Sequence, residues 1–258
     1  MTDAPPLKVE RRGPALWLTI DREARRNAMN PDVIAGIHEA VAGAARDGTR
    51  AIVLTGAGDK AFCAGADLSV GTSTFGAGDE PTTDFGRLAR TLRENGVPMI
   101  GRVNGACVAG GMGLLGLCDL AVAADHARFG LPEAKVGVFP YQVLVYLRTL
   151  ISARHINELC LTTDLIDAAR AYEMGLVNVV VPAANLDDEV ERLVSRVVAA
   201  SPGAIRRGKL AIAAMQSMAF PEAIAFAEAQ IALASRSTDA EEGLAAFNEK
   251  RPPRWSGE

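Results

Sequence analysis

Residues 99–124 read MIGRVNGACVAGGMGLLGLCDLAVAA, and this stretch decides the fold class. Its two ends, residues 99–103 and 120–124, are short apolar runs of the kind that form buried strands. Between them, residues 104–109 predict a turn, and the glycine-rich residues 110–118 predict a helix. Strands that alternate with helices are typical of a mostly parallel sheet covered by helices, so the sequence predicts an α/β fold.

The same alternation extends toward the N-terminus. Residues 15–20 place Leu and Ile on one face and Trp and Thr on the other, which predicts a strand, and residues 51–55 predict a second, buried strand. A helix is predicted from Pro31 with Asn30 as its N-cap, because asparagine is favoured at the cap and proline at the first helical position. Another helix is predicted over residues 83–95.

The pattern changes near residue 185, beyond which only helical signals are found. We therefore divide the chain into a core over residues 1–185 and a C-terminal helical region over residues 186–258. Residues 210–234 within the helical region are strongly apolar. An apolar surface of this size is costly to leave in water, so the region is expected to pack on its own core or on a neighbouring subunit.

Composition excludes several classes of protein. The 258 residues are 49% hydrophobic and 22% charged, which is ordinary globular composition and excludes a disordered, collagenous or coiled-coil chain. Lys and Arg number 27 against 31 Asp and Glu, which gives a net charge of −4. Because this charge offers no basic surface for a phosphate backbone, no nucleic-acid partner is expected.

Cysteine placement and hydropathy indicate a cellular compartment. The four cysteines, Cys63, Cys107, Cys118 and Cys160, are far apart and form no C-x-x-C pair, so no metal site is expected. The first residues lack an apolar signal segment, and no apolar run approaches the roughly 20 residues that a membrane helix needs. We therefore expect a reduced, cytoplasmic protein without a membrane partner.

The glycines of residues 111–116, GMGLLG, match the G-x-G-x-x-G fingerprint of dinucleotide-binding enzymes. That fold requires the first glycine to follow its strand directly, whereas residues 104–110 separate Val103 from Gly111 here. A nicotinamide enzyme is therefore an outside alternative.

The same glycines suit a second chemistry. A loop that enters a helix at Gly110 presents free backbone N–H groups. A second glycine-bearing segment, residues 61–68, lies in the loop predicted over residues 56–78 and could direct another N–H to the same point. Two such donors would stabilise an enolate. Alternatively, both segments are tight turns that close packing of helix and sheet requires.

Four motifs occur in order along the chain: RNAMN at 26–30, AFCAGADL at 61–68, NGACVAGGMGLLGLCD at 104–119 and FGLPE at 129–133. Together they resemble the enoyl-CoA hydratase/isomerase (crotonase) superfamily, and the resemblance runs from about residue 8 to Arg251. It implies a spiral of ββα units, with a helical C-terminal region that builds homotrimers or dimers of trimers. It also implies an acyl-CoA thioester substrate, with coenzyme A as part of the substrate and no separate cofactor.

The resemblance also implies site residues. The two oxyanion donors fall on the backbone N–H groups of Ala66 and Gly110, and Glu133 falls on a catalytic acid/base position. The positions that match the rest of the substrate and CoA pocket are Arg25, Asn27, Ala28, Ala64, Gly65, Asp67, Leu68, Gly111, Tyr141 and Lys250.

The sequence departs from the pattern of the family at two places. Gly113 stands where typical hydratases have a second glutamate, so a single carboxylate is visible. Residues 141–144, YQVL, replace a glycine-rich turn, and Tyr141 either shapes the acyl pocket or belongs to the core. Asp79, Glu80 or Asp84, in the polar loop over residues 71–84, could supply a replacement carboxylate, although such loop acids are usually solvated.

These observations predict an enoyl-CoA hydratase of lipid metabolism that uses Glu133 to move a proton next to an oxyanion-stabilised enolate. A double-bond isomerase stays open, because a single base can move a proton between two carbons of one substrate. A non-catalytic acyl-CoA-binding protein also stays open, since Gly113 removes one of the two usual carboxylates.

Overall fold

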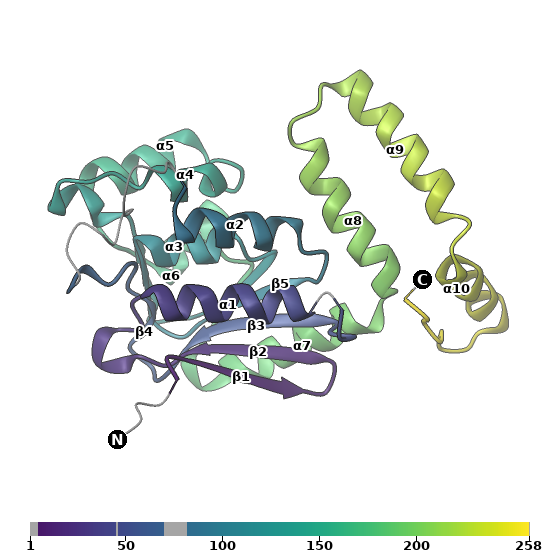
Figure 1. Cartoon of the computed structure of the whole chain (residues 1–258), viewed down its shortest axis with the longest axis horizontal. Coiled ribbons are helices and arrows are strands. Elements are labelled where there is room, and N and C mark those ends of the chain that lie inside the picture. The colour runs from purple at the N-terminus through teal and green to yellow at the C-terminus, as the bar shows by residue number, and fades with distance from the viewer. Residues whose placement is uncertain (1–4, 45, 70–81, 258) are drawn as a thin grey trace.

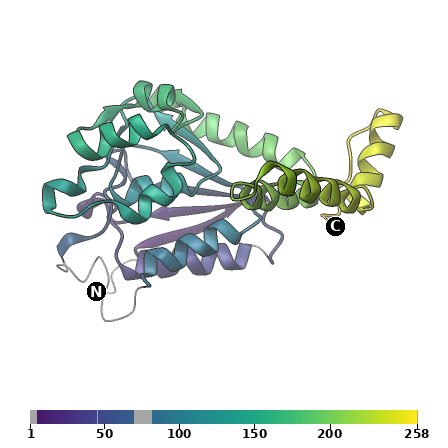
Figure 2. The ribbon, with the colours of Figure 1, turned by 90° about the horizontal axis from the view of Figure 1, so that it is seen from above.

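The computed structural model describes residues 5–44, 46–69 and 82–257. Two β-sheets and the helices around them form a core, from which the C-terminal helices α8 (Pro202–Met215), α9 (Phe220–Ala234) and α10 (Thr238–Glu249) project as an arm (Figure 1). The view from above shows the same separation of arm and core (Figure 2).

The larger sheet has six strands. In spatial order they are β1 (Leu7–Arg12), β2 (Ala15–Ile20), β3 (Ala51–Gly56), β5 (Met99–Val103), β7 (Leu120–Ala124) and β10 (Val179–Val181). The edge strand β1 is antiparallel to β2, and all other neighbours are parallel. The predicted α/β fold is therefore confirmed. The sequence pattern did not predict β1, because Leu7 is its single buried residue.

The two faces of the larger sheet bury different helices. The alternating residues Leu16, Leu18 and Ile20 of β2 join one hydrophobic cluster with α1 (Pro31–Ala44) and α2 (Asp84–Glu94). Trp17 joins a second cluster with α7 (Leu186–Ala199) on the opposite face. The predicted cap of α1 is confirmed, since Asn30 Oδ1 accepts a hydrogen bond of 3.0 Å from Val33 N. The division of the chain at residue 185 stays a prediction.

The smaller sheet has four strands and lies beside the first cluster. In spatial order they are β4 (Ala61–Cys63), β6 (Ala106–Val108), β8 (Arg128–Gly130) and β9 (Ile166–Asp167); the first three are parallel. A loop and a turn were predicted where β4 and β6 lie, and both predictions are wrong. Strands of three residues are too short to show the alternation by which a strand is predicted from sequence.

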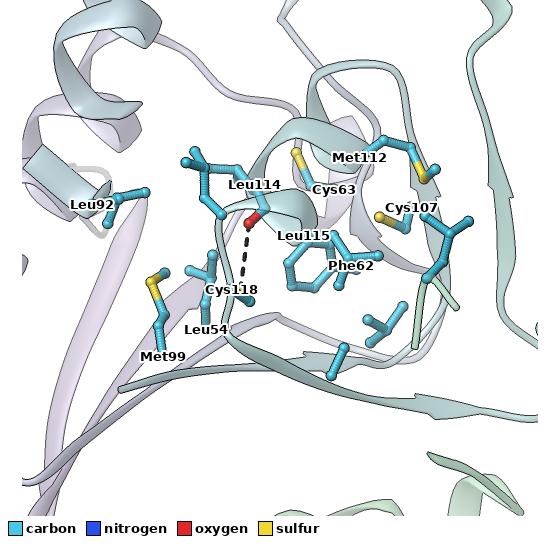
Figure 3. Close-up of a cluster of buried hydrophobic side chains, with 14 of the residues drawn as sticks. Leu54, Phe62, Cys63, Leu92, Met99, Cys107, Met112, Leu114, Leu115 and Cys118 are labelled. Carbon is cyan, nitrogen blue, oxygen red and sulfur yellow. Dashed lines mark hydrogen bonds between the residues drawn. The ribbon is translucent and has the colours of Figure 1, made fainter. Parts of the chain in front are cut away.

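Each short strand follows a long one, with β4 after β3, β6 after β5 and β8 after β7. A helix follows each pair: α2 after β4, α3 (Gly110–Gly116) after β6, and η3 (Pro132–Val136) with α4 (Tyr141–Leu147) after β8. The predicted repeat of ββα units is thereby confirmed. Phe62, Cys63 and Cys107 of the short strands enter the same buried cluster as Leu54 and Met99 of the long ones (Figure 3).

The remaining core helices lie between α4 and α7 in the chain. They are α5 (Ala153–Asn157), the π-helical turn η4 (Glu158–Thr162), α6 (Ala168–Met174) and η5 (Ala183–Asn185). In the arm, none of the α9 residues, all of which the structure describes, is buried. Among the described residues, no helix has the length and apolar character that crossing a membrane requires.

Candidate active site

Three predicted site residues follow the carboxyl ends of three neighbouring parallel strands. Ala66 comes three residues after the end of β4, Gly110 two after β6, and Glu133 three after β8. The carboxyl edge of parallel strands is where ligands bind in α/β proteins, because the loops there meet at one place. Strands are spaced by about 4.8 Å, so residues far apart in sequence are brought to one edge.

Ala66 and Gly110 lie next to each other. A Cβ placed on Gly110 would lie 3.4 Å from the Cα of Gly65 and 3.6 Å from the nitrogen of Ala66. Neither the Ala66 nor the Gly110 N–H donates to another residue in the part of the chain that the structure describes. Both residues are half-buried, so both donors are placed at an accessible surface.

The backbone around these donors is under tight constraint. Ala109, immediately before Gly110, has φ 52° and ψ −124°, which is the conformation of the first central residue of a type II′ turn. Such a conformation costs a non-glycine residue about 1–3 kcal/mol and is found chiefly at functional sites. Gly65 has φ +93°, and a Cβ on it would lie 2.8 Å from the Cβ of Ala109. Only glycine fits at residue 65.

A parallel bridge between Met29 and Ala66 holds the first donor. Met29 N donates to the Gly65 carbonyl at 2.7 Å, and Asp67 N donates to the Met29 carbonyl at 2.8 Å. Ala64 N donates to the Arg26 carbonyl at 3.1 Å. The N–H of Asp67, which follows Ala66, is thus used within the protein, and the N–H of Gly65, which precedes it, donates to the Cys63 sulfur. The N–H of Ala66 is the one left for a ligand.

Asn27 forms hydrogen bonds to the segment that leads to this loop. It is buried with φ 55°, and its Nδ2 donates to the carbonyls of Ala57 and Ala61 at 2.9 and 2.6 Å. Its Oδ1 accepts from Arg22 N at 3.0 Å. Because these loop groups occupy its side chain, Asn27 contributes to the site by positioning residues 61–67.

Asp67 has a similar role. Its carboxylate accepts from the Ser69 hydroxyl at 2.7 Å and from Arg22 Nη2 at 2.7 Å, and these hydrogen bonds lower its pKa to about 2. Arg22 Nη1 also donates to the carbonyl of Ala28, which is itself buried. The ion pair therefore ties residues 22–28 to the segment that carries Ala66.

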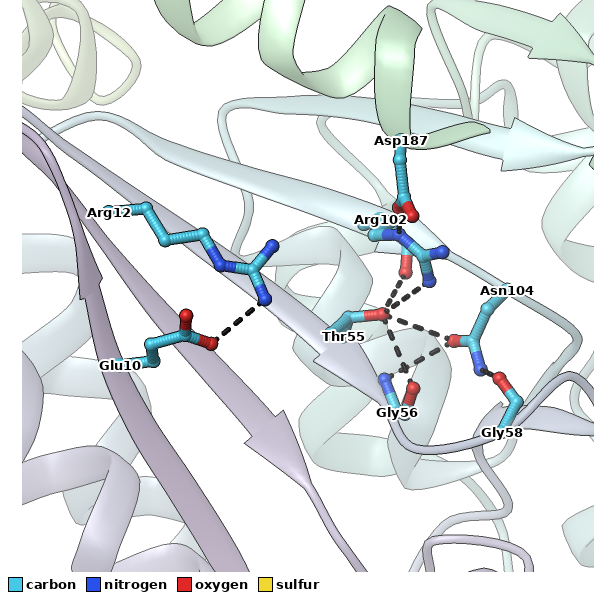
Figure 4. A network of polar contacts seen from close by, with 8 residues as sticks. All are labelled: Glu10, Arg12, Thr55, Gly56, Gly58, Arg102, Asn104 and Asp187. Carbon is cyan, nitrogen blue, oxygen red and sulfur yellow. Dashed lines mark hydrogen bonds and ion pairs between the residues drawn. The ribbon is translucent and has the colours of Figure 1, made fainter. Parts of the chain in front are cut away.

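Asn104 links the two sheets at the turn between β3 and β4. Its Oδ1 accepts from Gly56 N at 3.2 Å, and its Nδ2 donates to the carbonyls of Gly58 and Ala61 at 2.7 and 3.2 Å (Figure 4). Asn104 precedes β6 by two residues, so one side chain fixes the start of β6 against the start of β4. The relative position of the two donor loops depends on this contact.

Glu133 is the carboxylate at the same edge. It lies in the first turn of η3 after Pro132, and its Oε2 is buried with no hydrogen-bond partner in the described part of the chain. Burial raises its pKa above the ordinary value of 4.5. A carboxyl group with a raised pKa and an unpartnered oxygen is suited to take up and release a proton.

A second carboxylate is absent from the described residues around Gly113. A Cβ on Gly113 would lie 2.7 Å from Phe85 Cζ and 3.1 Å from Val143 Cγ2, so apolar groups fill the adjoining space. Asp79 and Glu80 lie outside the described residues, whereas Asp84, the first residue of α2, is exposed and forms an ion pair with Arg87. Sequence reasoning missed Phe85, because nothing in its local pattern indicates contact with a helix that lies far along the chain.

The remaining predicted residues lie apart from this edge. Tyr141 is 75% exposed at the start of α4, so the alternative that it belongs to the core is wrong. Arg25, the last residue of the 3-10 helix η1 (Glu23–Arg25), and Leu68, two residues after Ala66, are both exposed. Lys250 ends α10, at the far end of the arm from α3 within the same chain (Figure 1).

The three glycines of the dinucleotide fingerprint are packing positions. A Cβ on Gly111 would lie 2.2 Å from the Cys63 carbonyl oxygen, and one on Gly116 would lie 3.3 Å from Leu147 Cδ2. Gly113 faces Phe85 as described above. Moreover, the first glycine of the fingerprint, Gly111, lies inside α3 rather than in the turn that joins β6 to this helix, whereas a dinucleotide fold has that glycine in the turn. This geometry disfavours a nicotinamide enzyme.

Comparisons with known proteins agree with this geometry. A family model described as enoyl-CoA hydratase/isomerase matches residues 12–258. A crotonyl-CoA hydratase of Syntrophomonas wolfei is 32% identical, over 91% of each chain, and a carnitinyl-CoA dehydratase of Salmonella arizonae is 32% identical over 97% of this chain and 98% of the relative. The crystal structure of an enoyl-CoA hydratase from Mycobacterium smegmatis matches with a TM-score of 0.90 and 33% identity, covering 98% of this chain and 99% of that one. The chain therefore belongs to the enoyl-CoA hydratase/isomerase family, the crotonase superfamily that its four motifs resemble.

Proposed function

We propose that this protein hydrates a 2-enoyl-CoA thioester. The observation that carries the proposal is the placement at one edge of the smaller sheet of two unused backbone N–H groups, on Ala66 and Gly110, and of the Glu133 carboxyl group, whose buried Oε2 has no partner in the described residues. Hydration requires an oxyanion to be stabilised while a proton is moved, and this set of groups offers both.

The reaction divides among these groups as follows. The Ala66 and Gly110 N–H groups bind the thioester carbonyl oxygen and stabilise the negative charge that develops on it. The Glu133 carboxylate takes a proton from water, and the hydroxide oxygen bonds to Cβ while the electrons of the C=C bond move into the enolate. Protonated Glu133 then gives that proton to Cα, and the C=O bond re-forms. One water is added, and Glu133 returns to its starting state.

The raised pKa of Glu133 suits both halves of this cycle. Burial disfavours its charged form, which makes the carboxylate a stronger base toward water and keeps the protonated form available for donation to Cα. With one carboxylate in both roles, hydroxyl and proton are added to the same face of the double bond.

Double-bond isomerisation is the second candidate, and the apolar surroundings of Gly113 favour it. Moving a proton from one carbon to another needs a base but no water, and the groups that Phe85 and Val143 place beside Gly113 are apolar. A non-catalytic acyl-CoA-binding protein would keep the two N–H donors without turnover.

The decisive experiment measures the absorbance of 2-enoyl-CoA thioesters of several lengths while they are incubated with wild type or with Glu133→Gln. This absorbance is lost when water adds to the double bond. We expect wild type to consume at least one thioester and the variant to consume none. Glu158→Gln is the matched control, because Glu158 is an exposed carboxylate on the neighbouring turn η4, paired with Arg170 at 3.3 Å. Consumption of 3-enoyl thioesters alone would assign the isomerase, and binding without turnover would assign the binding protein.

We further propose a cytoplasmic role in lipid metabolism and a homotrimeric or dimer-of-trimers assembly. Phe220, Ile231 and Phe247 of the arm are 79%, 69% and 82% exposed, which is costly in water for large apolar side chains. In such an assembly, the arm would bring Lys250 toward the CoA phosphates of a neighbouring protomer. Light scattering tests the assembly, and a monomeric mass would contradict it.

A further inference from the structure

A phenylalanine on α2 closes the space beside Gly113. Gly113 lies three residues after Gly110, so the two glycines share one face of α3 about 4.5 Å apart along its axis. A Cβ at Gly113 would lie 2.7 Å from Phe85 Cζ and 3.1 Å from Val143 Cγ2. The ring of Phe85 and the methyl of Val143 therefore form an apolar wall one helical turn from the proposed oxyanion donor.

Polar contacts behind the ring hold this wall in place. Thr83 caps α2, with its Oγ1 accepting from Gly86 N at 2.9 Å. Gln142 Nε2 donates to the same Oγ1 at 2.6 Å. Because Gln142 precedes Val143 in α4 and Thr83 precedes Phe85 in α2 by two residues, one hydroxyl fixes both halves of the wall relative to each other.

Phe85 is more exposed than the buried residues of the same helix. Leu88 and Leu92 of α2 are 0% and 2% exposed and lie fully in the core. Phe85 packs against the same core but is only partly buried. A ring that contacts a buried glycine and stays partly open to solvent is what the wall of a ligand pocket requires.

We infer that Phe85 is a specificity-determining residue that limits the acyl group to short, uncharged chains. The inference rests on the proposed function, because the position of the thioester oxygen at Ala66 and Gly110 determines where the acyl chain begins. Carbons beyond Cβ that run along α3 reach the ring within one helical turn. A longer chain collides with the ring, and a charged or hydroxylated group loses its water there without gaining a partner.

The test compares kcat/KM of wild type and Phe85→Ala for three substrates. These are crotonyl-CoA, 2-octenoyl-CoA and a four-carbon 2-enoyl thioester that carries a quaternary ammonium group. We expect wild type to prefer crotonyl-CoA, and the variant to raise the octenoyl-to-crotonyl ratio by about 10-fold or more, since pocket contacts discriminate methylene groups by roughly 10–200-fold. The charged substrate should stay poor with both proteins. An unchanged octenoyl-to-crotonyl ratio in folded Phe85→Ala overturns the inference.

Leu88→Ala is the matched control on the same helix. Truncating this buried residue lowers the melting temperature but should leave the substrate ratio as in wild type. An equal shift in both variants would show that any disturbance of α2 changes the ratio, and would overturn the role of Phe85. If Phe85→Ala does not fold, Phe85→Leu shortens the side chain more gently and should give an intermediate ratio.

A binding measurement separates this inference from the proposed function. Dissociation constants of butyryl-CoA and octanoyl-CoA are measured by calorimetry for wild type and Phe85→Ala. If wild type consumes no enoyl thioester, the proposed function fails, yet a shift in the octanoyl-to-butyryl ratio still supports Phe85 as the wall. Equal ratios in the two proteins would overturn it.

Discussion

The two sheets of this protein differ in size, continuity and task. The larger sheet has strands of five or six residues, apart from the three-residue β10, and buries a cluster on each face. The smaller sheet has strands of two or three residues, and its carboxyl edge brings Ala66, Gly110 and Glu133 together. The larger sheet therefore contributes buried side chains to both clusters, whereas the proposed chemistry rests on the loops of the smaller one.

The largest effect that this comparison predicts is on activity at the smaller sheet. Glu133→Gln should lower kcat/KM for the enoyl thioester by about 10²–10⁴-fold, because a positioned acid/base contributes that much. Steady-state assays measure this loss. The melting temperature of the variant should equal or exceed that of wild type, since the substitution removes a half-buried carboxyl group whose Oε2 has no partner in the described residues. A variant with lower stability and intact activity would reverse the assignment of tasks.

The next largest effect is a loss of stability without a loss of activity, and it is expected at the larger sheet. Leu54 of β3 is 0% exposed and belongs to the main cluster (Figure 3). Leu54→Ala should lower the free energy of unfolding by about 2–5 kcal/mol, as buried leucines do when truncated. Urea unfolding measures this loss, and kcat per folded protein should stay within about twofold of wild type. A fall in kcat as large as that in Glu133→Gln would contradict the separation.

Asn104 lies where the two sheets meet, and its substitution should affect both quantities. Asn104→Ala leaves the buried N–H of Gly56 without this partner, which costs about 1–3 kcal/mol, and loosens the turn that leads to β4. We expect lower stability and a several-fold lower kcat, measured by urea unfolding and steady-state kinetics.

The larger sheet offers a matched control. Asn178 Oδ1 accepts from Ala121 N at 2.8 Å beside β7, away from the site loops. Asn178→Ala should therefore lower stability while kcat is retained. Equal losses of kcat in the two asparagine variants would show that the coupling is general rather than local to Asn104.

The same contrast explains what could be predicted from the sequence. Long apolar strands and the cap at Asn30 are local features, so the larger sheet was predicted apart from β1 and β10. The short strands β4 and β6 carry no readable alternation, and they were predicted as a loop and a turn. The glycine pattern indicated backbone donors at Gly110 and within residues 61–68, but Ala66 itself and the role of Glu133 came from motif resemblance. Phe85 was missed because its contact with Gly113 joins two separate helices.

The smallest predicted effect is the pH dependence of stability, for which two carboxyl groups at the smaller sheet have opposite signs. Because the pKa of Glu133 is raised in the folded state, the folded state binds more protons than the unfolded state at pH values between 4.5 and the pKa of folded Glu133. Its contribution is therefore lost as pH rises through that window. Asp67 has a pKa lowered from 3.8 to about 2, so its contribution is present above 3.8 and is lost as pH falls toward 2.

Melting temperatures of wild type, Glu133→Gln and Asp67→Asn from pH 2 to 8 measure both contributions, because all other groups cancel in the differences. Relative to Glu133→Gln, wild type should become less stable as pH rises above 4.5. Relative to Asp67→Asn, wild type should lose its advantage as pH falls below 3.8. If the difference in melting temperature between wild type and Glu133→Gln does not vary with pH, the Glu133 carboxyl group is solvated like that of an ordinary surface glutamate. The edge of the smaller sheet would then lack the buried acid/base that distinguishes it from the larger sheet.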